Sequence, residues 1–240
     1  MVDVDKQDIH NVGKMLGLLP WQSEKDYIQH LFLKELYQLI ATDLVFKGGT
    51  ALQKVYGLPR FSRDLDFNAV KTAEFGVIIT KIAKIFRTYG FLVDIKKEKH
   101  KFAENYLILF DSPEFKNSLS VQISLREKTL TKPHTEIVTP MYREIPPYSV
   151  YVMTLDEILA EKVRAILTRG FPRDVYDLWF LLKKGVKPNY ELINQKISFS
   201  KDEFKRKIED IRREWSSELS KLIQHYPPFD EVKQLIVSML

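Results

Sequence analysis

The chain has 240 residues, enough for one large domain or two small ones, and its 15 Phe, 11 Tyr and 3 Trp need a buried core, which excludes a protein that is disordered throughout. It has no cysteine, which excludes disulfides, thiolate metal sites and a cysteine nucleophile and is compatible with a reducing cytoplasm. The formal net charge of +5 is mild and favours anionic partners such as nucleotides or RNA only slightly.

Residues 1–41 are expected to form an N-terminal helical segment. The beginning of this segment is weakly patterned, but between residues 23 and 40 apolar side chains recur at intervals of three and four, which predicts a helix that Ser23 can cap. Residues 1–6 are acidic and have no apolar stretch, so no secretory signal is predicted. Apolar runs are also too short to span a membrane, so we expect a cytoplasmic protein with no membrane partner.

Residues 42–153 alternate between strand and helix patterns and are expected to form a mixed α/β core. Short β-rich runs between polar turns predict the strands, and periodicity of three to four predicts the helices, which end at Gly57 and Gly90. The expected strands are residues 42–46, 64–68, 91–95, 106–110, 119–125 and 148–153, and the expected helices are residues 50–56 and 75–89.

Residues 154–240 are expected to form a helical C-terminal domain. The sequence Thr-Leu-Asp-Glu at residues 154–157 is a capping box, and Pro172 favours the first position of a second helix that ends at Gly185. Further helices are expected over residues 201–215 and after the Pro-Pro pair at residues 227–228. The predicted fold class is therefore α/β, a mixed sheet followed by a helical unit.

Gly48, Gly49 and Thr50 follow a predicted strand and open a predicted helix. Two glycines let the backbone turn tightly and let a phosphate approach without a Cβ in the way, and the N–H groups at a helix start attract anions. An ordinary strand-to-helix turn explains the same residues, and for a Gly-Gly pair alone it is the more frequent explanation.

Asp64 and Asp66 are two residues apart on a predicted strand. Their side chains therefore face the same side, with Cα atoms about 6.5–7 Å apart, while Leu65 and Phe67 face the core. Adjacent carboxylates repel each other unless a cation lies between them, and Mg²⁺ favours one or two carboxylates together with phosphates and waters. The pair can thus hold a metal that bridges a triphosphate to an incoming hydroxyl. A solvated strand edge is the alternative, because Asp-x-Asp is common.

The two patterns occur together in residues 45–67, VFKGGTALQKVYGLPRFSRDLDF. This block resembles the AbiEii/AbiGii-type toxins of the nucleotidyltransferase superfamily, in which a Gly-Gly/Ser turn is followed by Asp-x-Asp/Glu. The resemblance implies a polymerase-β-like nucleotidyltransferase fold and the transfer of a nucleoside monophosphate from a nucleoside triphosphate with Mg²⁺ or Mn²⁺. It also implies the toxin of a type IV-like toxin–antitoxin or abortive-infection system, with tRNA, another RNA or a protein as acceptor and a cognate antitoxin as partner.

The same resemblance implies site residues in the block. The metal ligands are expected to be Asp64 and Asp66. The residues expected to hold the triphosphate or neutralise its charge are Lys47, Gly48, Gly49, Thr50 and Arg63.

The resemblance extends to about residue 184. Residues 156–165 are similar to a Lys-x-x-Ala helix of the family that carries Lys162, and residues 173–178 are similar to an Arg-Asp-x-x-Asp-Leu helix that carries Asp174 and Asp177. Lys162 is expected to contact phosphate and Asp174 to support the site. The alternatives are a solvated helix lysine for Lys162 and helix capping with a surface ion pair for Asp174.

Gln122 stands where the wider superfamily often has a third carboxylate. A neutral amide cannot act as a general base or as an anionic metal ligand. Either Asp174 or Asp177 substitutes, or the metal alone deprotonates the acceptor, or the fold binds nucleotide or RNA without turnover. A protein-kinase-like phosphotransferase is disfavoured, because the sequence has neither a Gly-x-Gly-x-x-Gly loop nor a His-Arg-Asp motif.

Two further features receive a structural interpretation. The histidines have no metal-ligand spacing, and each is expected at the surface: His10, His30, His100, His134 and His225. The basic cluster at residues 96–101 lies beside Phe102 and Tyr106 and can grip an RNA backbone, but a solvated hairpin turn is the preferred interpretation.

Overall fold

The computed structural model describes residues 6–71, 73–111 and 116–240, and the chain divides into two compact units. Unit 1 comprises Met1–Gly57, Phe61–Thr129 and Pro133–Val152, and unit 2 comprises Leu58–Arg60, Leu130–Lys132 and Met153–Leu240. The helical segment expected at residues 1–41 thus belongs to the same unit as the sheet. Most of the acidic N-terminal stretch, residues 1–5, lies outside the described residues.

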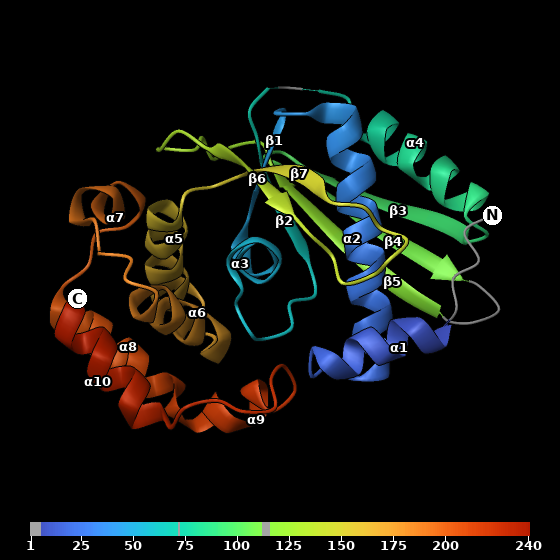
Figure 1. The fold of residues 1–240 in the computed structure, drawn as a ribbon. Coiled ribbons are helices and arrows are strands. Elements are labelled where there is room, and N and C mark those ends of the chain that lie inside the picture. The colour runs from blue at the N-terminus through green and yellow to red at the C-terminus, as the bar shows by residue number, and fades with distance from the viewer. Residues whose placement is uncertain (1–5, 72, 112–115) are drawn as a thin grey trace. The chain divides into compact units, whose positions relative to one another are not determined.

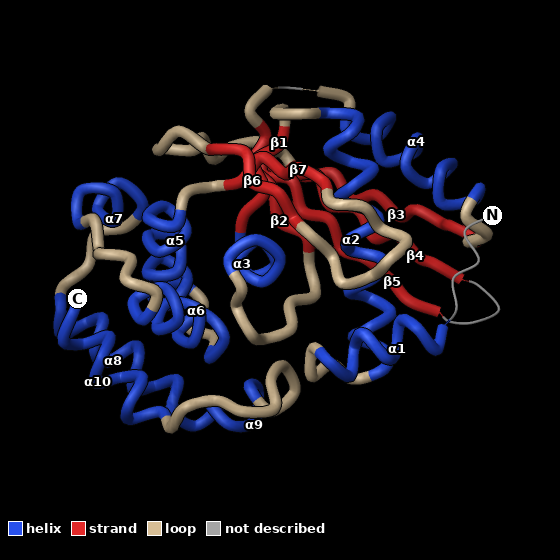
Figure 2. The backbone as a smooth tube through the Cα atoms, in the orientation of Figure 1, coloured by secondary structure: helices blue, strands red, loops and turns tan. Residues whose placement is uncertain are grey.

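Within the described residues, unit 1 contains one mixed sheet with the strand order β3-β4-β5-β2-β1-β7-β6 (Figure 2). The β1–β7 and β2–β5 pairs are parallel and the other pairs are antiparallel. The strands are β1 Leu44–Lys47, β2 Leu65–Ala69, β3 Leu92–His100, β4 Ala103–Asp111, β5 Lys116–Ser124, β6 His134–Val138 and β7 Tyr148–Val152. The expected mixed sheet is therefore confirmed, and β6 is an additional edge strand.

Four described helices complete unit 1: α1 Lys6–Met15, α2 Pro20–Ile40, α3 Gly48–Tyr56 and α4 Phe75–Thr88. α2 and α4 pack on one face of the sheet (Figure 1), where Phe46, Phe67 and Phe86 belong to the same buried core. Leu65 and Phe67 are fully buried, which confirms the face predicted for them from the alternation on β2.

The start of α2 differs from the prediction. The helix begins at Pro20, and the Gln22 side chain accepts a hydrogen bond from the Leu19 N–H at 2.9 Å. Ser23 lies inside the first turn, where its hydroxyl donates to the Leu19 carbonyl oxygen at 3.0 Å. Ser23 was the wrong cap because proline favours the first helical position, where its missing N–H costs nothing.

Unit 2 is helical throughout its long C-terminal segment. Its helices are α5 Leu155–Thr168, α6 Pro172–Lys183, α7 Tyr190–Lys196, α8 Lys201–Ile211, the 3₁₀ helix η1 Arg212–Glu214, α9 Trp215–Leu219 and α10 Phe229–Met239. The Thr154 hydroxyl accepts from the Glu157 N–H at 3.4 Å, and α6 begins at Pro172, so both predicted helix starts are confirmed. The continuous helix predicted over residues 201–215 is wrong, because η1 interrupts it.

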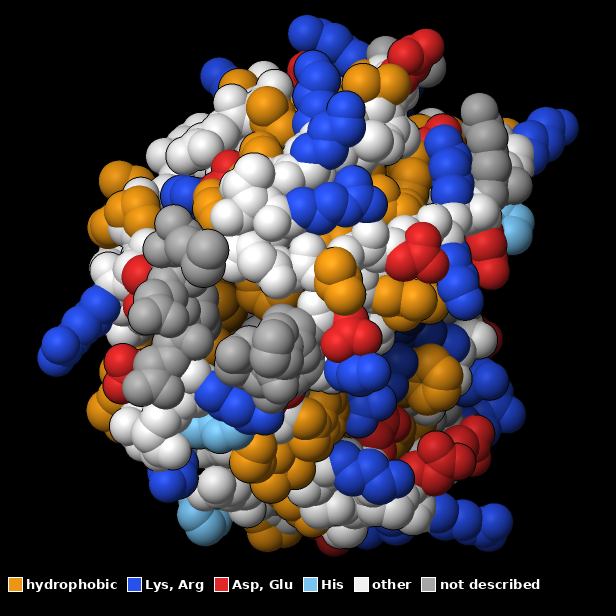
Figure 3. Space-filling view, turned by 90° about the vertical axis from the view of Figure 1, so that its right-hand side faces the viewer, with side chains coloured by type: hydrophobic (Ala, Val, Ile, Leu, Met, Phe, Trp, Pro, Cys, Tyr) orange, Lys and Arg blue, Asp and Glu red, His pale blue; other side chains and the backbone are white. Residues whose placement is uncertain are grey.

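The surface carries no single dominant charge on the face that Figure 3 shows. Lys and Arg side chains are distributed there among hydrophobic ones instead of gathering in one patch, as the mild net charge leads us to expect. None of the described helices has the length and apolar character needed to cross a membrane.

Candidate functional site

The turn between β1 and α3 approaches the Asp66 carboxylate closely. Gly48 has a φ of +76°, and a Cβ placed on it would lie 2.6 Å from Asp66 Oδ2. Lys47, the residue before it, is the register partner of Asp66 across the β1–β2 pair. Glycine is therefore required at residue 48 both for its backbone conformation and for the room that Asp66 needs.

Asp66 lies on the face of β2 opposite to Leu65 and Phe67. It is half-buried, whereas Asp64 directly precedes the strand and is exposed. Gln122 of β5 is the register partner of Asp66 and is exposed, so its carboxamide lies on the face of the Asp66 carboxylate. The Asp66 carboxylate, one carboxamide and the N-terminus of α3 thus converge within unit 1, and Asp64 lies two residues before Asp66 in the chain.

The donor set in unit 1 fits a metal that arrives with its own phosphate ligands. Among the described residues, no group of three or more His, Asp or Glu side chains is arranged to hold a metal by itself. Asp64 and Asp66 supply two carboxylates, which is the usual protein contribution to a Mg²⁺ ion that also binds substrate phosphates and waters.

The Thr50 side chain holds the backbone segment at residues 62–64, which leads into β2. It is fully buried, and its hydroxyl donates to the Asp64 carbonyl oxygen while lying 2.8 Å from Ser62 Oγ. The side chain of Thr50 is therefore used inside the protein. What it can offer to a phosphate is its main-chain N–H, one of the first in α3 and thus without an acceptor within the helix.

The two basic residues predicted in unit 1, Lys47 and Arg63, both precede the carboxylate pair in the sequence. Lys47 Nζ lies 3.1 Å from Glu127 Oε2, so its charge is partly neutralised. Arg63 is exposed, directly precedes Asp64, and its Cζ lies 5.3 Å from the centre of the Trp21 ring.

Lys162, Asp174 and Asp177 form a buried charge cluster in unit 2. Lys162 Nζ lies 2.9 Å from Asp174 Oδ1 and 2.7 Å from Asp177 Oδ2. Arg60 donates from Nε and Nη2 to the two carboxylate oxygens of Asp177, each at 2.6 Å, and Arg169 binds Asp174 in the same bidentate way. Burial alone would raise the pKa of Asp174, but the charges of Lys162 and Arg169 outweigh burial and hold it below its usual range.

This cluster gives its members a structural role. Lys162 is only 5% exposed and both carboxylates nearest to its Nζ are ion partners, so a phosphate would have to displace one of them. Asp177, expected only as an alternative to Asp174 in replacing the third carboxylate, is as central to the cluster as Asp174. Arg60 was missed altogether, although it lies in the block at residues 45–67 on which the resemblance rests, four residues before Asp64.

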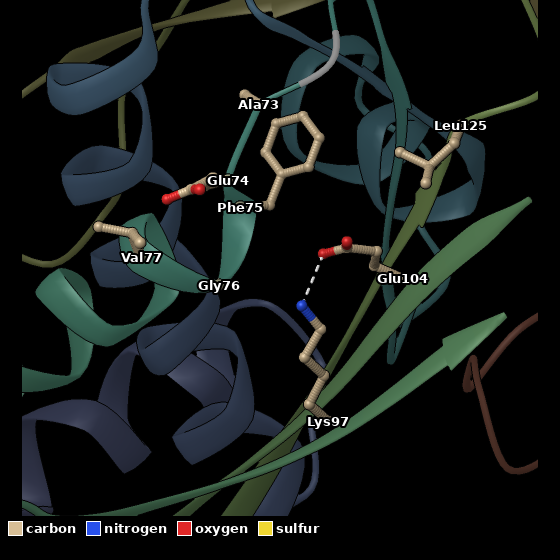
Figure 4. Close-up of a pocket in the computed structure, with 8 residues that line it drawn as sticks. All are labelled: Ala73, Glu74, Phe75, Gly76, Val77, Lys97, Glu104 and Leu125. Atoms are coloured by element: carbon tan, nitrogen blue, oxygen red, sulfur yellow. Dashed lines mark ion pairs between the residues drawn. The ribbon is translucent and has the colours of Figure 1, made fainter. Parts of the chain in front are cut away.

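A cavity of about 710 Å³ lies elsewhere in unit 1, between the start of α4 and strands β3 and β4 (Figure 4). Its lining includes Lys97 and Glu104, whose side chains form an ion pair at 3.1 Å. Glu104 pairs in register with Ile123 and therefore faces the helix-covered side of the sheet, opposite to Asp66. None of the predicted site residues lines this cavity.

The interpretations of the basic cluster and of the histidines can be compared with the structure. The basic cluster forms the end of β3 and the tight turn to β4, which confirms a hairpin. The expectation that every histidine is at the surface is wrong for His30, whose Nδ1 lies 2.9 Å from the Tyr148 hydroxyl in the core. Burial and the charge of Lys54 lower the pKa of His30 to about 3. The apolar side chains that recur around His30 in α2 were the signal from which its burial could have been predicted.

A family model for the nucleotidyl transferase AbiEii toxin of type IV toxin–antitoxin systems matches residues 32–235. The chain belongs to this family. The AbiEii match extends beyond the region of sequence resemblance, and it includes the glycine turn, the carboxylate pair and the charge cluster of unit 2. Membership implies the general reaction class of nucleotidyl transfer, a nucleotide substrate and a cognate antitoxin.

Solved structures from Helicobacter pylori are similar in fold. JHP933 is 20% identical with a TM-score of 0.57, and the match covers 91% of this chain and 89% of that one. A second H. pylori chain, solved as a candidate nucleotidyltransferase, is 20% identical with a TM-score of 0.56, over 90% of this chain and 91% of that one. These likenesses confirm the expected fold class. A search of curated proteins found no match.

Proposed function

We propose that this AbiEii-family protein transfers a nucleoside monophosphate from a nucleoside triphosphate to an acceptor hydroxyl. The observation that carries the proposal is the approach of Gly48 to Asp66, because it brings the N-terminus of α3 to the carboxylate pair. A triphosphate held by those N–H groups lies beside the residues that can hold its metal. The acceptor is tRNA, another RNA or a protein hydroxyl.

Each residue of unit 1 has a defined task in this proposal. The main-chain N–H groups of Gly48, Gly49 and Thr50 hold the triphosphate, and the charges of Lys47 and Arg63 offset its negative charge. Transfer of this type depends mainly on positioning and charge neutralisation, so such a small set of residues is sufficient.

Asp64 and Asp66 would hold Mg²⁺ or Mn²⁺. The metal supplies charge neutralisation at the phosphates and acidifies the acceptor hydroxyl. Gln122, beside Asp66, cannot remove a proton, but its amide can donate a hydrogen bond to a phosphate oxygen or to Asp66.

Lys162 and Asp174 enter the proposal as positioning residues. Their ion pairs are buried in unit 2, and Arg60 in the same cluster lies four residues before Asp64 in the chain. We propose that the cluster fixes the start of the segment that carries the carboxylates. The cytoplasm, where nucleoside triphosphates and RNA occur together, is the proposed location.

The test measures Mg²⁺-dependent release of pyrophosphate and labelling of RNA with each of the four nucleoside triphosphates. Asp64→Asn and Asp66→Asn should each reduce transfer to background while the melting temperature stays close to wild type, because Asp64 is exposed and Asp66 faces away from the buried side of β2. Asp94→Asn, at an exposed position of β3, is the matched control and should retain activity. Wild-type transfer by either site variant would rule out the metal assignment.

A binding module on the same fold is the second candidate. Gln122 favours it, because no carboxylate stands beside Asp66 on β5 to act as a base. Such a module would bind nucleotide or RNA without releasing pyrophosphate. Pyrophosphate release that depends on Asp64 excludes it.

A further inference from the structure

One face of α2 runs along the segment that leads into β2. Trp21, Lys25 and Gln29 are spaced four residues apart and so share this face. Gln29 Nε2 donates hydrogen bonds to the carbonyl oxygens of Ser62, at 2.9 Å, and Arg63, at 3.0 Å. The helix therefore fixes the backbone just before the carboxylate pair.

Trp21 and Arg63 form an exposed aromatic–cation pair at the start of this face. Arg63 Cζ lies 5.3 Å from the centre of the Trp21 ring, and the fully buried ring of Phe61 meets Trp21 edge-to-face at 5.5 Å. Trp21 nevertheless remains 39% exposed. A rigid aromatic ring beside a guanidinium is a preformed surface on which a nucleobase of any identity can stack.

Lys25 places a further positive charge on the same face of α2. It lies one turn after Trp21 and one turn before Gln29, whose side chain binds the carbonyl oxygens of Ser62 and Arg63. An incoming phosphate thus finds two cations, Lys25 and Arg63, beside the segment that leads to Asp64.

The two ends of the carboxylate pair are therefore different. Asp66 is approached by Gly48 and the N-terminus of α3, where the proposed function places the triphosphate. Asp64 directly follows the backbone segment that the face of α2 with Lys25 and Gln29 contacts, and Arg63, the residue before it, lies beside Trp21. A group that binds at the Asp64 end lies across the metal ligands from the triphosphate, as an attacking acceptor must.

We propose that Trp21, Lys25 and Arg63 form an acceptor platform that positions a single-stranded nucleic acid for transfer. A base at the reacting end stacks on Trp21 and Arg63, and the adjoining phosphate contacts Lys25. The proposal rests on the proposed function for the identity of the reaction, but binding to the platform requires no turnover.

The test separates the acceptor strand from the nucleoside triphosphate. Affinity for a fluorescein-labelled 12-residue oligoadenylate is measured by fluorescence anisotropy in EDTA, and affinity for each nucleoside triphosphate by calorimetry with Mg²⁺. Trp21→Ala and Arg63→Ala should each weaken oligonucleotide binding about tenfold, the range expected for the loss of one stacked base. Trp21→Ala, which removes no residue assigned to the triphosphate, should change the affinity for triphosphates less than twofold. Trp21→Phe should restore part of the affinity, because it retains a ring.

Phe102→Ala is the matched control. Phe102 is 50% exposed in unit 1, with Lys101 Nζ at 5.3 Å and Arg126 Cζ at 5.6 Å from its ring, so it repeats the composition of the platform far from Asp64 in the sheet register. Loss of the Phe102 ring should leave the affinity for the oligonucleotide unchanged. Thermal melts of all variants verify folding, and the exposed Arg63 provides the variant least able to disturb it.

Three results would overturn the platform. They are wild-type protein that fails to bind the oligonucleotide, platform variants that bind it as wild type does or a Trp21→Ala protein that loses triphosphate affinity instead, and an equal loss in Phe102→Ala. Failure of the proposed function has a different signature. It is pyrophosphate release that survives in Asp64→Asn, whatever the oligonucleotide affinities are.

Discussion

Gly48 combines a left-handed backbone with a close approach to a functional carboxylate, and the two effects can be separated. Gly57 has nearly the same φ, +78° against +76°, but a Cβ on Gly57 would meet nothing within 4 Å. An alanine at either residue should lower the free energy of unfolding by about 1–2 kcal/mol through backbone strain. Only Gly48→Ala also displaces the Asp66 carboxylate.

We therefore predict that Gly48→Ala loses transfer activity about a hundredfold, the cost typical of a catalytic group misplaced by about 1 Å. Gly57→Ala should lose stability to a similar extent and keep its activity at a temperature where both proteins are folded. Urea unfolding and initial rates of pyrophosphate release measure the two properties. Equal activities of the two variants would contradict a role for the close approach.

His30 makes the stability of the fold depend on pH. Its folded-state pKa of about 3 lies below the unfolded value of about 6.5. Below about pH 6.5 the unfolded chain therefore binds a proton that the folded protein does not bind. The contribution of neutral His30 is complete above that pH and is lost as the pH falls toward 3, at up to about 1.4 kcal/mol per pH unit.

The prediction is that His30→Gln flattens the pH dependence of the free energy of unfolding between pH 6.5 and 5. Urea titrations at half-unit intervals measure it, above the range in which carboxylates protonate. His225→Gln, at an exposed position, is the control and should retain the wild-type slope. An unchanged slope in His30→Gln would mean that other groups cause it.

At the scale of an element, α2 is both a core helix and a clamp on the segment before β2. The two hydrogen bonds from Gln29 to Ser62 and Arg63 are the described contacts by which the clamp acts on the backbone. Gln29→Glu keeps the shape of the side chain and removes its donors. It should cost about 1–3 kcal/mol of stability, because buried carbonyl oxygens lose their partners.

Loss of the clamp should also lower transfer, because the Asp64 backbone is no longer fixed. Thermal unfolding and initial rates on the same samples report the two effects. Gln195→Glu, on an exposed position of α7, introduces the same charge and should change neither. Full activity in Gln29→Glu would show that Thr50 alone holds the segment.

At the scale of the whole molecule, unit 2 depends on a buried set of paired charges. Arg60 binds Asp177, Arg169 binds Asp174, and Lys162 contacts both carboxylates. Removing Lys162 leaves two buried carboxylates without the cation that lies between them, so they repel each other. Lys162→Met should therefore destabilise the protein by about 3–5 kcal/mol.

Lys187→Met is the control for this prediction, because Lys187 is exposed, and it should be within about 0.5 kcal/mol of wild type. Fluorescence of Trp179 and Trp215 reports unfolding of unit 2 directly. A Lys162→Met protein with wild-type stability and no activity would instead support direct contact with phosphate.

Local signals were sufficient where structure depends on neighbours in the sequence. The N-cap at Thr154, the stop at Gly57 and the alternation of Leu65 and Phe67 on β2 all act within a few residues, and each is confirmed. The reciprocal half of the predicted capping box is not formed, because the Glu157 carboxylate binds Leu130, Thr131 and Lys196 instead. α1 and β6 were missed because their patterns are weak. β6 is an edge strand, so one side of it needs no strand partner.

The sequence by itself determined the glycine turn, the carboxylate pair and membership in the nucleotidyltransferase fold, because these features lie in one short block whose residues are close along the chain. Only the tertiary structure decided that Lys162 is an internal ion partner, that His30 is buried and that α2 clamps the segment before Asp64. Those outcomes depend on contacts between residues 12 or more positions apart, or on desolvation by a packed core. Local periodicity encodes neither the distant contacts nor the desolvation.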